Sequence, residues 1–239
     1  LGALKTARVA YAKAVEAQPN VEQYHIARLQ FLLAHFAEDA SAIEAAFGED
    51  ERLAYVCYKD VTSPTNTRTM IAAFLPPAGV LNSAPLILPD PRIGPRRVCC
   101  LLANLNSFAL DYVARQKVGG VHLNFFIVEQ FPVFSPDEYD RKCPWNERQT
   151  LERWISERVL KLTCTADDMR PLAEACGLKE PVHKWHPDER AKLMAELDAA
   201  YFHLYGVQRD DAEYILSTFA GAGRGDAESL GTPAAAKLI

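Results

Sequence analysis

The chain has 239 residues, of which 49% are hydrophobic and 24% are charged, a composition typical of a globular protein with a substantial core. Its formal net charge of −5 at pH 7 argues against an autonomous nucleic-acid-binding protein, which usually carries a basic surface, but leaves room for a local basic patch. No apolar run is long enough to cross a membrane, and residues 1–18 lack the apolar core of a signal peptide. We therefore expect a cytoplasmic protein without a membrane partner.

Residues 1–50 carry apolar side chains at three- and four-residue spacing, which predicts a helical segment. The missing initiator methionine indicates a fragment or a processed chain. The pattern changes at residue 51. The runs 52–58 and 69–75 are rich in aromatic and β-branched residues, which predicts strands, and a shorter run at 86–88 completes a small sheet.

The stretch 97–133 contains three different patterns in quick succession. Apolar residues at helical spacing predict a helix over 97–115, and a polar loop with two glycines follows at 116–124. The continuous apolar run 125–128 predicts a buried strand. A helix and a strand would thus hold one polar loop on a rigid frame, and such loops often carry recognition.

Helical periodicity returns after residue 136 and predicts helices at 144–162, 166–175, 187–204 and 210–219. The fold class is therefore α+β, with N-terminal helices, a small central mixed sheet that includes the helix–loop–strand unit, and a C-terminal helical bundle. Its predicted parts are a helical segment at 1–50, an α/β core at 51–136, a helical subdomain at 137–220 and a flexible tail at 221–239.

Motifs for catalysis or metal binding are weak in this chain. The six cysteines form no C-x-x-C pair, so we interpret them as scattered core thiols rather than disulfides or zinc ligands. His183 and His186 are close in sequence but lack a third ligand. The F-x-G-x-G pattern at 219–223 is typical of S-adenosylmethionine sites, but it follows a predicted helix instead of a strand, and only 16 residues remain after it. An intact small methyltransferase is therefore not expected.

Polar and basic residues gather in three predicted loops. Such side chains contact phosphates and base edges, and glycines let a backbone approach a ligand closely. From the residues alone, ordinary solvated loop side chains are favoured over DNA contacts, and Asn124 would then cap the segment that follows it. The candidate residues are Arg68 in the first loop, Arg92, Arg96 and Arg97 in the second, and Gln116, Lys117, Gly119, Gly120, His122 and Asn124 in the third.

Three stretches resemble one known family. Residues 101–133 read LLANLNSFALDYVARQKVGGVHLNFFIVEQFPV, residues 58–86 read YKDVTSPTNTRTMIAAFLPPAGVLNSAPL, and residues 189–219 read ERAKLMAELDAAYFHLYGVQRDDAEYILSTF. All three, in their order along the chain, resemble the C-terminal target-recognition region of large adenine-N6 DNA methylases of restriction–modification and phage-defence systems, including the type IIG class. The resemblance covers roughly residues 51–219. Residues 1–50 do not share it.

The resemblance implies a DNA sequence recognition domain within a site-specific adenine-N6 DNA methyltransferase. The catalytic and cofactor motifs of that family lie upstream of this region, so it implies no catalytic residue and no cofactor in this chain. S-adenosylmethionine would bind the parent enzyme, and the partners would be double-stranded DNA and the upstream methyltransferase domain. The loop 116–124 would read the DNA, and the four arginines would contact phosphates or guanine edges. An alternative is a protein-interaction or scaffold domain that docks the methylase or another subunit.

Overall fold

The computed structural model describes residues 52–78, 80, 83–90 and 92–220. The predicted helical segment 1–50 and the tail 221–239 lie outside these described residues. The chain forms two compact units, one of Leu1–Arg52 with Pro77–Asn82 and one of Leu53–Pro76 with Ser83–Ile239. The second unit contains most of the predicted α/β core and all of the predicted helical subdomain.

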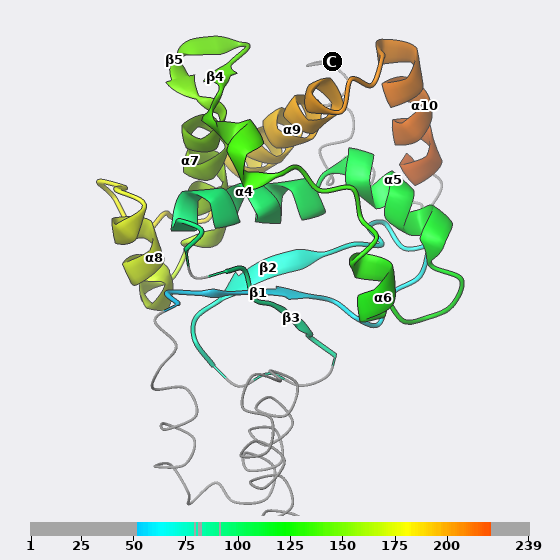
Figure 1. Cartoon of the computed structure of the whole chain (residues 1–239), viewed down its shortest axis with the longest axis horizontal. Coiled ribbons are helices and arrows are strands. Elements are labelled where there is room, and N and C mark those ends of the chain that lie inside the picture. Colours follow the sequence, from blue (N-terminus) through cyan, green and yellow to red (C-terminus); the bar gives the residue numbers. More distant parts are fainter. Residues whose placement is uncertain (1–51, 79, 81–82, 91, 221–239) are drawn as a thin grey trace, which may run out of the picture. The chain divides into compact units, whose positions relative to one another are not determined.

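A three-stranded antiparallel sheet lies at one side of the unit. Its strands are β1 (Tyr55–Tyr58), β2 (Ala72–Leu75) and β3 (Leu86–Ile87), in the order β2-β1-β3. Strand β1 is buried along its whole length because it is central and consists of aromatic, β-branched and cysteine side chains. Figure 1 shows the helices α4, α5, α7, α9 and α10 on one side of this sheet.

The predicted helix over 97–115 is two helices. Helix α4 spans Pro95–Leu105 and α5 spans Phe108–Lys117, with the break at Asn106 and Ser107. The side-chain amide of Asn106 donates to Ala72 O at 2.9 Å and accepts from Ala72 N at 3.0 Å, so it binds the backbone of β2. The hydroxyl of Ser107 accepts from Leu110 N at 3.3 Å and caps α5. The single-helix prediction was therefore wrong.

The predicted buried strand at 125–128 is also wrong. These residues form the short helix α6, Phe125–Val128, in which Ile127 is buried while Phe125 and Phe126 are 55% and 61% exposed. The carbonyl of Asn124 accepts from the amides of Ile127 and Val128, at 3.0 and 3.2 Å, and this closes the helical turn. Strand β1 is already paired on both edges, by β2 and β3, and offers no place for another strand beside it.

The C-terminal half of the unit is mainly helical, as predicted. The start of the predicted helix at 144–162 forms a hairpin instead, and Trp145 in that hairpin packs against Trp154 with ring centroids 5.1 Å apart. The elements are the 3-10 turns η1 (Pro136–Asp140) and η2 (Asp167–Met169), strands β4 (Lys142–Cys143) and β5 (Asn146–Thr150), and helices α7 (Leu151–Thr163), α8 (Arg170–Ala175), α9 (Pro187–Leu204) and α10 (Arg209–Ala220). With seven α-helices and two small sheets among the described residues, the α+β prediction is confirmed.

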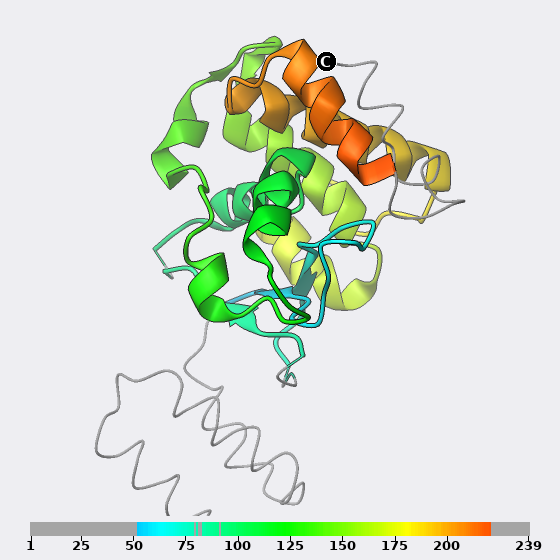
Figure 2. The same ribbon diagram turned by 90° about the vertical axis from the view of Figure 1, so that its right-hand side faces the viewer.

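Two groups of buried side chains hold the unit together. The larger lies among the sheet and helices α4, α5, α7, α8 and α9, with Val56, Leu102 and Ile155 among its buried members. The smaller attaches α10 to α5, two helices that lie side by side in Figure 1 and in Figure 2. Its members Phe108 and Phe219 have ring centroids 4.7 Å apart. All six cysteines are buried and free, as expected for core thiols. No helix among the described residues is long and apolar enough to cross a membrane.

Candidate nucleic-acid interface

The third predicted loop surrounds a concave surface, which we call the loop hollow, with a volume of about 470 Å³. Five of the residues predicted from the sequence line this surface, and all five belong to the predicted loop 116–124. The hollow is lined by Lys117, Gly119, Gly120, Val121, His122, Asn124, Phe126, Ile127 and Gln130. Gln116, the remaining predicted residue of this loop, is exposed at the end of α5 and does not line the hollow.

Backbone hydrogen bonds fix the loop against the chain that leaves β1. The amide of Thr62 donates to Val121 O at 3.0 Å, and the amide of Leu123 donates to Asp60 O at 2.8 Å. Val118 and Leu123 point inward and are buried, which anchors the loop on both sides of the glycines. The loop backbone is therefore fixed to the rest of the unit, and this gives its polar side chains defined positions.

The polar side chains of the hollow have few partners. Lys117 Nζ donates to Gln130 Oε1 at 3.1 Å, and Gln130 Nε2 donates to Phe126 O at 2.6 Å. His122 Nδ1 lies 2.6 Å from Asp60 Oδ2. Asn124 occupies the N-cap of α6, but its side chain makes no capping hydrogen bond and is exposed. The Asn124 amide is thus available to a ligand.

Exposed apolar side chains lie next to the hollow. Val121, Phe125 and Phe126 are 55–61% exposed, an unusual exposure for three such large side chains in one short segment. The Phe125 ring packs edge-on against Tyr58, with centroids 6.3 Å apart. The Tyr58 hydroxyl is buried without a hydrogen-bond partner among the described residues, and burial together with the nearby charges of Asp60 and Glu129 raises its pKa to about 12. Tyr58 is therefore a neutral support beneath Phe125.

The predicted arginines are placed differently. Arg68 is almost enclosed: its guanidinium donates to Asp198 Oδ2 and Asn106 O, both at 3.1 Å, and stacks over the Phe108 ring at 3.2 Å. These contacts join three distant parts of the chain. The side chain is 10% exposed, so the prediction that Arg68 contacts DNA is not compatible with its position. Arg68 is a residue of the core.

Two of the three arginines in the second predicted cluster are held by contacts to distant parts of the protein. Arg96 donates to Ser156 Oγ at 3.2 Å and to the carbonyl of Cys176, which connects α4 with α7 and α8. Arg97 binds both carboxylate oxygens of Asp140 at 2.8 Å and extends to two further acids, so its charge is compensated. Arg92 is 90% exposed and pairs with Asp90. None of these arginines lines the loop hollow.

Two polar or aromatic members of the hollow were missed from the sequence. Phe126 lies in the apolar run that predicts a buried strand, and Gln130 lies beyond the predicted loop. A helical interpretation of 125–128 would have placed both beside the loop, because residues four apart share a helix face. Among the described residues there is also no group of three or more histidine, cysteine or acidic side chains that could hold a metal ion.

Comparison with known proteins adds no family to this picture. No family model, curated protein or solved structure matches the chain. The F-x-G-x-G pattern begins at Phe219 in α10, where that side chain is buried against α5, and its glycines at 221 and 223 lie outside the described residues.

Proposed function

We propose that this chain is the DNA sequence recognition part of a site-specific adenine-N6 DNA methyltransferase, and that the loop hollow contacts double-stranded DNA. One observation carries the proposal. Lys117, Gly119, Gly120, His122 and Asn124, which belong to one of the stretches that carry the family resemblance, all line one concave surface. The proposal for the chain's role rests on the resemblance, and the proposal for the contact surface rests on this convergence.

The chemistry of the hollow suits a nucleic-acid backbone and base edges. The ammonium group of Lys117 is exposed and would bind a phosphate. An asparagine amide pairs with the N6 and N7 atoms of adenine, and the amide of Asn124 is available for such a contact. A Cβ added at Gly119 or Gly120 would meet no atom within 4 Å, so the protein itself does not require glycine there. Close approach of a ligand backbone is a reason to keep it.

The exposed phenylalanines fit the same interface. Apolar side chains contact the methyl group of thymine in the major groove, and in some complexes they are inserted between base steps. Phe126 lines the hollow, and Phe125 stands beside it on Tyr58. Their exposure is unfavourable in an isolated soluble domain, so a partner surface that covers them would be stabilising.

The charge of the hollow predicts weak binding by this chain alone. Lys117 is the one lining residue with a permanent positive charge, and the whole chain has a net charge of −5. Because most of the affinity for DNA comes from phosphate neutralisation, the upstream methyltransferase domain would have to complete a basic groove. In this proposal that domain also binds S-adenosylmethionine and performs the methyl transfer on a flipped adenine.

A salt titration of DNA binding tests the proposal. The change is Lys117→Ala, measured by fluorescence anisotropy of the full chain with a mixed-sequence duplex at several salt concentrations. Loss of one phosphate contact should weaken binding and reduce the slope of log K against log salt by about 1. The matched control is Lys192→Ala on α9, which removes another exposed lysine with a single polar neighbour, Glu196 at 4.0 Å. The proposal for the hollow would be wrong if Lys117→Ala and Lys192→Ala had equal effects on DNA binding. It would also be wrong if the wild-type chain showed no detectable binding at low salt.

A second candidate function is docking of a protein partner, and the exposed apolar side chains beside the loop hollow favour it. Contiguous exposed apolar side chains often mark protein-interaction surfaces, and Val121, Phe125 and Phe126 are of this kind. Phe126→Ala separates the two functions. Under the docking alternative it abolishes association with the methyltransferase domain and leaves intrinsic DNA binding by this chain unchanged. Under our proposal it lowers DNA binding in the absence of that domain.

A further inference from the structure

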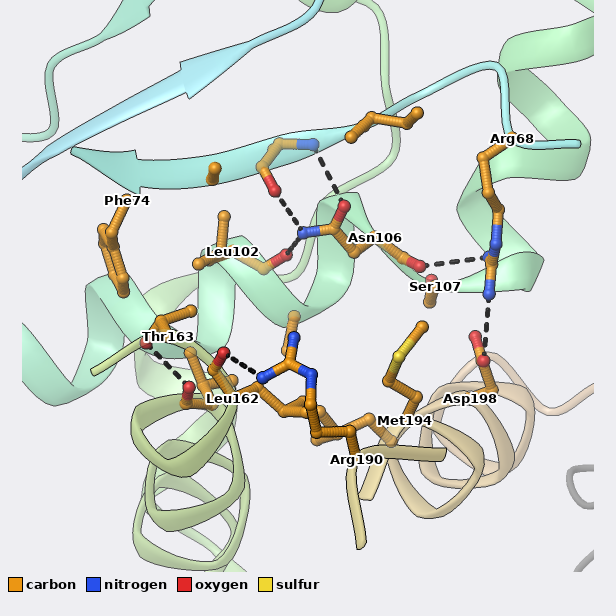
Figure 3. Close-up of a pocket in the computed structure, with 16 residues that line it drawn as sticks. Arg68, Phe74, Leu102, Asn106, Ser107, Leu162, Thr163, Arg190, Met194 and Asp198 are labelled. Carbon is orange, nitrogen blue, oxygen red and sulfur yellow. Dashed lines mark hydrogen bonds and ion pairs between the residues drawn. The ribbon is translucent and has the colours of Figure 1, made fainter. Parts of the chain in front are cut away.

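A second cavity, which we call the β2–α9 pocket, lies where β2, the end of α4, the end of α7 and α9 meet (Figure 3). Its volume is about 470 Å³, within the range of small-molecule sites in proteins. It shares no lining residue with the loop hollow. Its walls are mainly apolar and include Ile71, Phe74, Leu102, Leu162, Met194 and Leu197. An occupant must therefore have an apolar body.

One polar end of the pocket is already satisfied by the protein. Arg68 is paired with Asp198 there, and the second oxygen of Asp198 accepts from Phe108 N at 2.8 Å. The side-chain amide of Asn106 is used by the backbone of Ala72. The polar groups at this end already have partners within the protein, so they offer a ligand few hydrogen bonds.

Arg190, at the α9 side of the pocket, is in a different situation. Its Nη1 donates to Leu162 O at 2.6 Å, and its guanidinium stacks over the Trp185 ring at 3.6 Å. No carboxylate among the described residues forms an ion pair with it. Burial lowers the pKa of Arg190, and a guanidinium remains charged even so. The pocket thus contains a charged group whose counter-ion is absent from the described part of the chain.

A neighbouring arginine shows what Arg190 lacks. Arg158 stacks over the Trp154 ring at 3.5 Å and donates to the carbonyl of Trp154 at 3.0 Å, the same two kinds of contact. In addition it binds Glu196 at 2.7 Å. The two arginines are therefore alike except that Arg158 has a carboxylate and lies outside the pocket, whereas Arg190 lines the pocket and has none.

We propose that the β2–α9 pocket binds a small organic carboxylate with an apolar body, of the size of a medium-chain fatty acid. Its carboxylate pairs with the free side of the Arg190 guanidinium and supplies the counter-ion that Glu196 supplies to Arg158. Its apolar body lies against Phe74, Leu102 and Met194. Charge-assisted pairing with a guanidinium in an apolar surrounding gives the site a preference for anions over neutral molecules of the same shape. This site is independent of the proposed DNA contact.

Calorimetric titration of the full chain with octanoate, octanol and octylammonium tests the site. We expect saturable binding of octanoate, binding of octanol weaker by about tenfold or more, and no measurable binding of octylammonium. Arg190→Gln should reduce octanoate affinity toward that of octanol, and Met194→Trp, which fills the pocket, should abolish binding of both. Arg158→Gln is the matched control and should leave octanoate affinity unchanged.

Each remaining outcome contradicts the proposal. Equal affinity for octanoate and octanol would show that Arg190 does not select a carboxylate. Undiminished binding to Met194→Trp would place the ligand elsewhere on the molecule. If no variant of Arg190 folds, as judged by circular dichroism, the comparison of the three ligands on the wild-type chain and on Met194→Trp still decides the matter. The absence of saturable octanoate binding to the wild-type chain would overturn the site altogether.

Discussion

Arg68 and Asp198 form an enclosed ion pair, with Nη2 and Oδ2 3.1 Å apart and side chains that are 10% and 4% exposed. The pair joins the segment before β2 to α9, and Asp198 also binds the first amide of α5 at Phe108. Burial raises the pKa of Asp198, while Arg68 and the Phe108 amide oppose that rise by stabilising the ionised carboxylate. Three elements that are far apart in sequence thus depend on one charged contact.

Loss of Arg68 should strongly destabilise the unit. Arg68→Ala leaves the carboxylate of Asp198 buried without its partner, which should lower the free energy of unfolding by about 3–5 kcal/mol. Urea denaturation followed by circular dichroism measures this. Arg209→Ala is the control, because Arg209 pairs with Glu213 on the surface of α10 and should cost less than about 1 kcal/mol. A cost for Arg68→Ala no greater than that of the control would mean that the pair contributes little.

The element most accurately predicted from the sequence is α9. Its signals are local: a proline and two acids in its first turn, Asp188 and Glu189, and the Tyr205–Gly206 pair at its end, where Gly206 has a positive φ of 70°. Such signals determine a helix without reference to the rest of the chain. The predicted bounds 187–204 are those of the structure.

The incorrect predictions have long-range causes. The helix over 97–115 is interrupted at Asn106 because that side chain binds β2, 34 residues earlier in the chain. The run 125–128 cannot pair with β1, whose two edges are occupied by β2 and β3, and it forms a helical turn. A four-residue apolar run does not distinguish a strand from a helix by itself. The sequence suggests that Arg68 is an exposed arginine in a loop, because its ion-pair partner Asp198 lies 130 residues further along the chain. The loop hollow was predictable in part, since most of its polar residues are consecutive.

The two kinds of glycine in this unit should respond differently to alanine. Gly177 ends α8 with a φ of 72°, and its neighbour Leu178 donates to Ala173 O at 3.0 Å, the arrangement in which a left-handed residue is required. Gly177→Ala should lower the unfolding free energy by about 1 kcal/mol. Gly119 lacks a positive φ and has open space around it, so Gly119→Ala should leave the urea midpoint almost unchanged. Equal losses at both positions would contradict this distinction.

The stability of the unit should depend on pH through His183. Burial lowers the pKa of His183 below its ordinary value of 6.5, helped by the nearby positive charge of Lys161, and its buried Nε2 has no partner among the described residues. The unfolded chain then binds this proton at a higher pH than the folded chain. The stability that the folded chain gains by keeping His183 neutral is therefore fully present above pH 6.5. It is lost as the pH falls from 6.5 through the lowered pKa of His183 in the folded chain.

Urea midpoints at several pH values between 7.5 and 5 measure the His183 effect. We expect a lower midpoint for the wild-type chain at the acid end and a smaller decrease for His183→Gln, which carries no titrating group. A decrease of the same size in both proteins would assign the acid sensitivity to other residues.

Under the proposed function, Asn124 should determine part of the DNA sequence that the parent methyltransferase modifies. Its side chain is exposed at the rim of the loop hollow and is not used in capping α6, so Asn124→Ala should leave the urea midpoint close to that of the wild type. A bidentate contact between asparagine and adenine contributes about 1–3 kcal/mol of discrimination, and its loss should relax the preference at one position of the site. Sequencing of methylated sites, after expression of the variant with the upstream methyltransferase domain, measures this.

Gln116→Ala provides the comparison, because Gln116 belongs to the same predicted loop but does not line the hollow. If Asn124→Ala gives the same motif as the wild type, the hollow does not read the bases. If Gln116→Ala alone changes the motif, the reading surface lies on the last turn of α5.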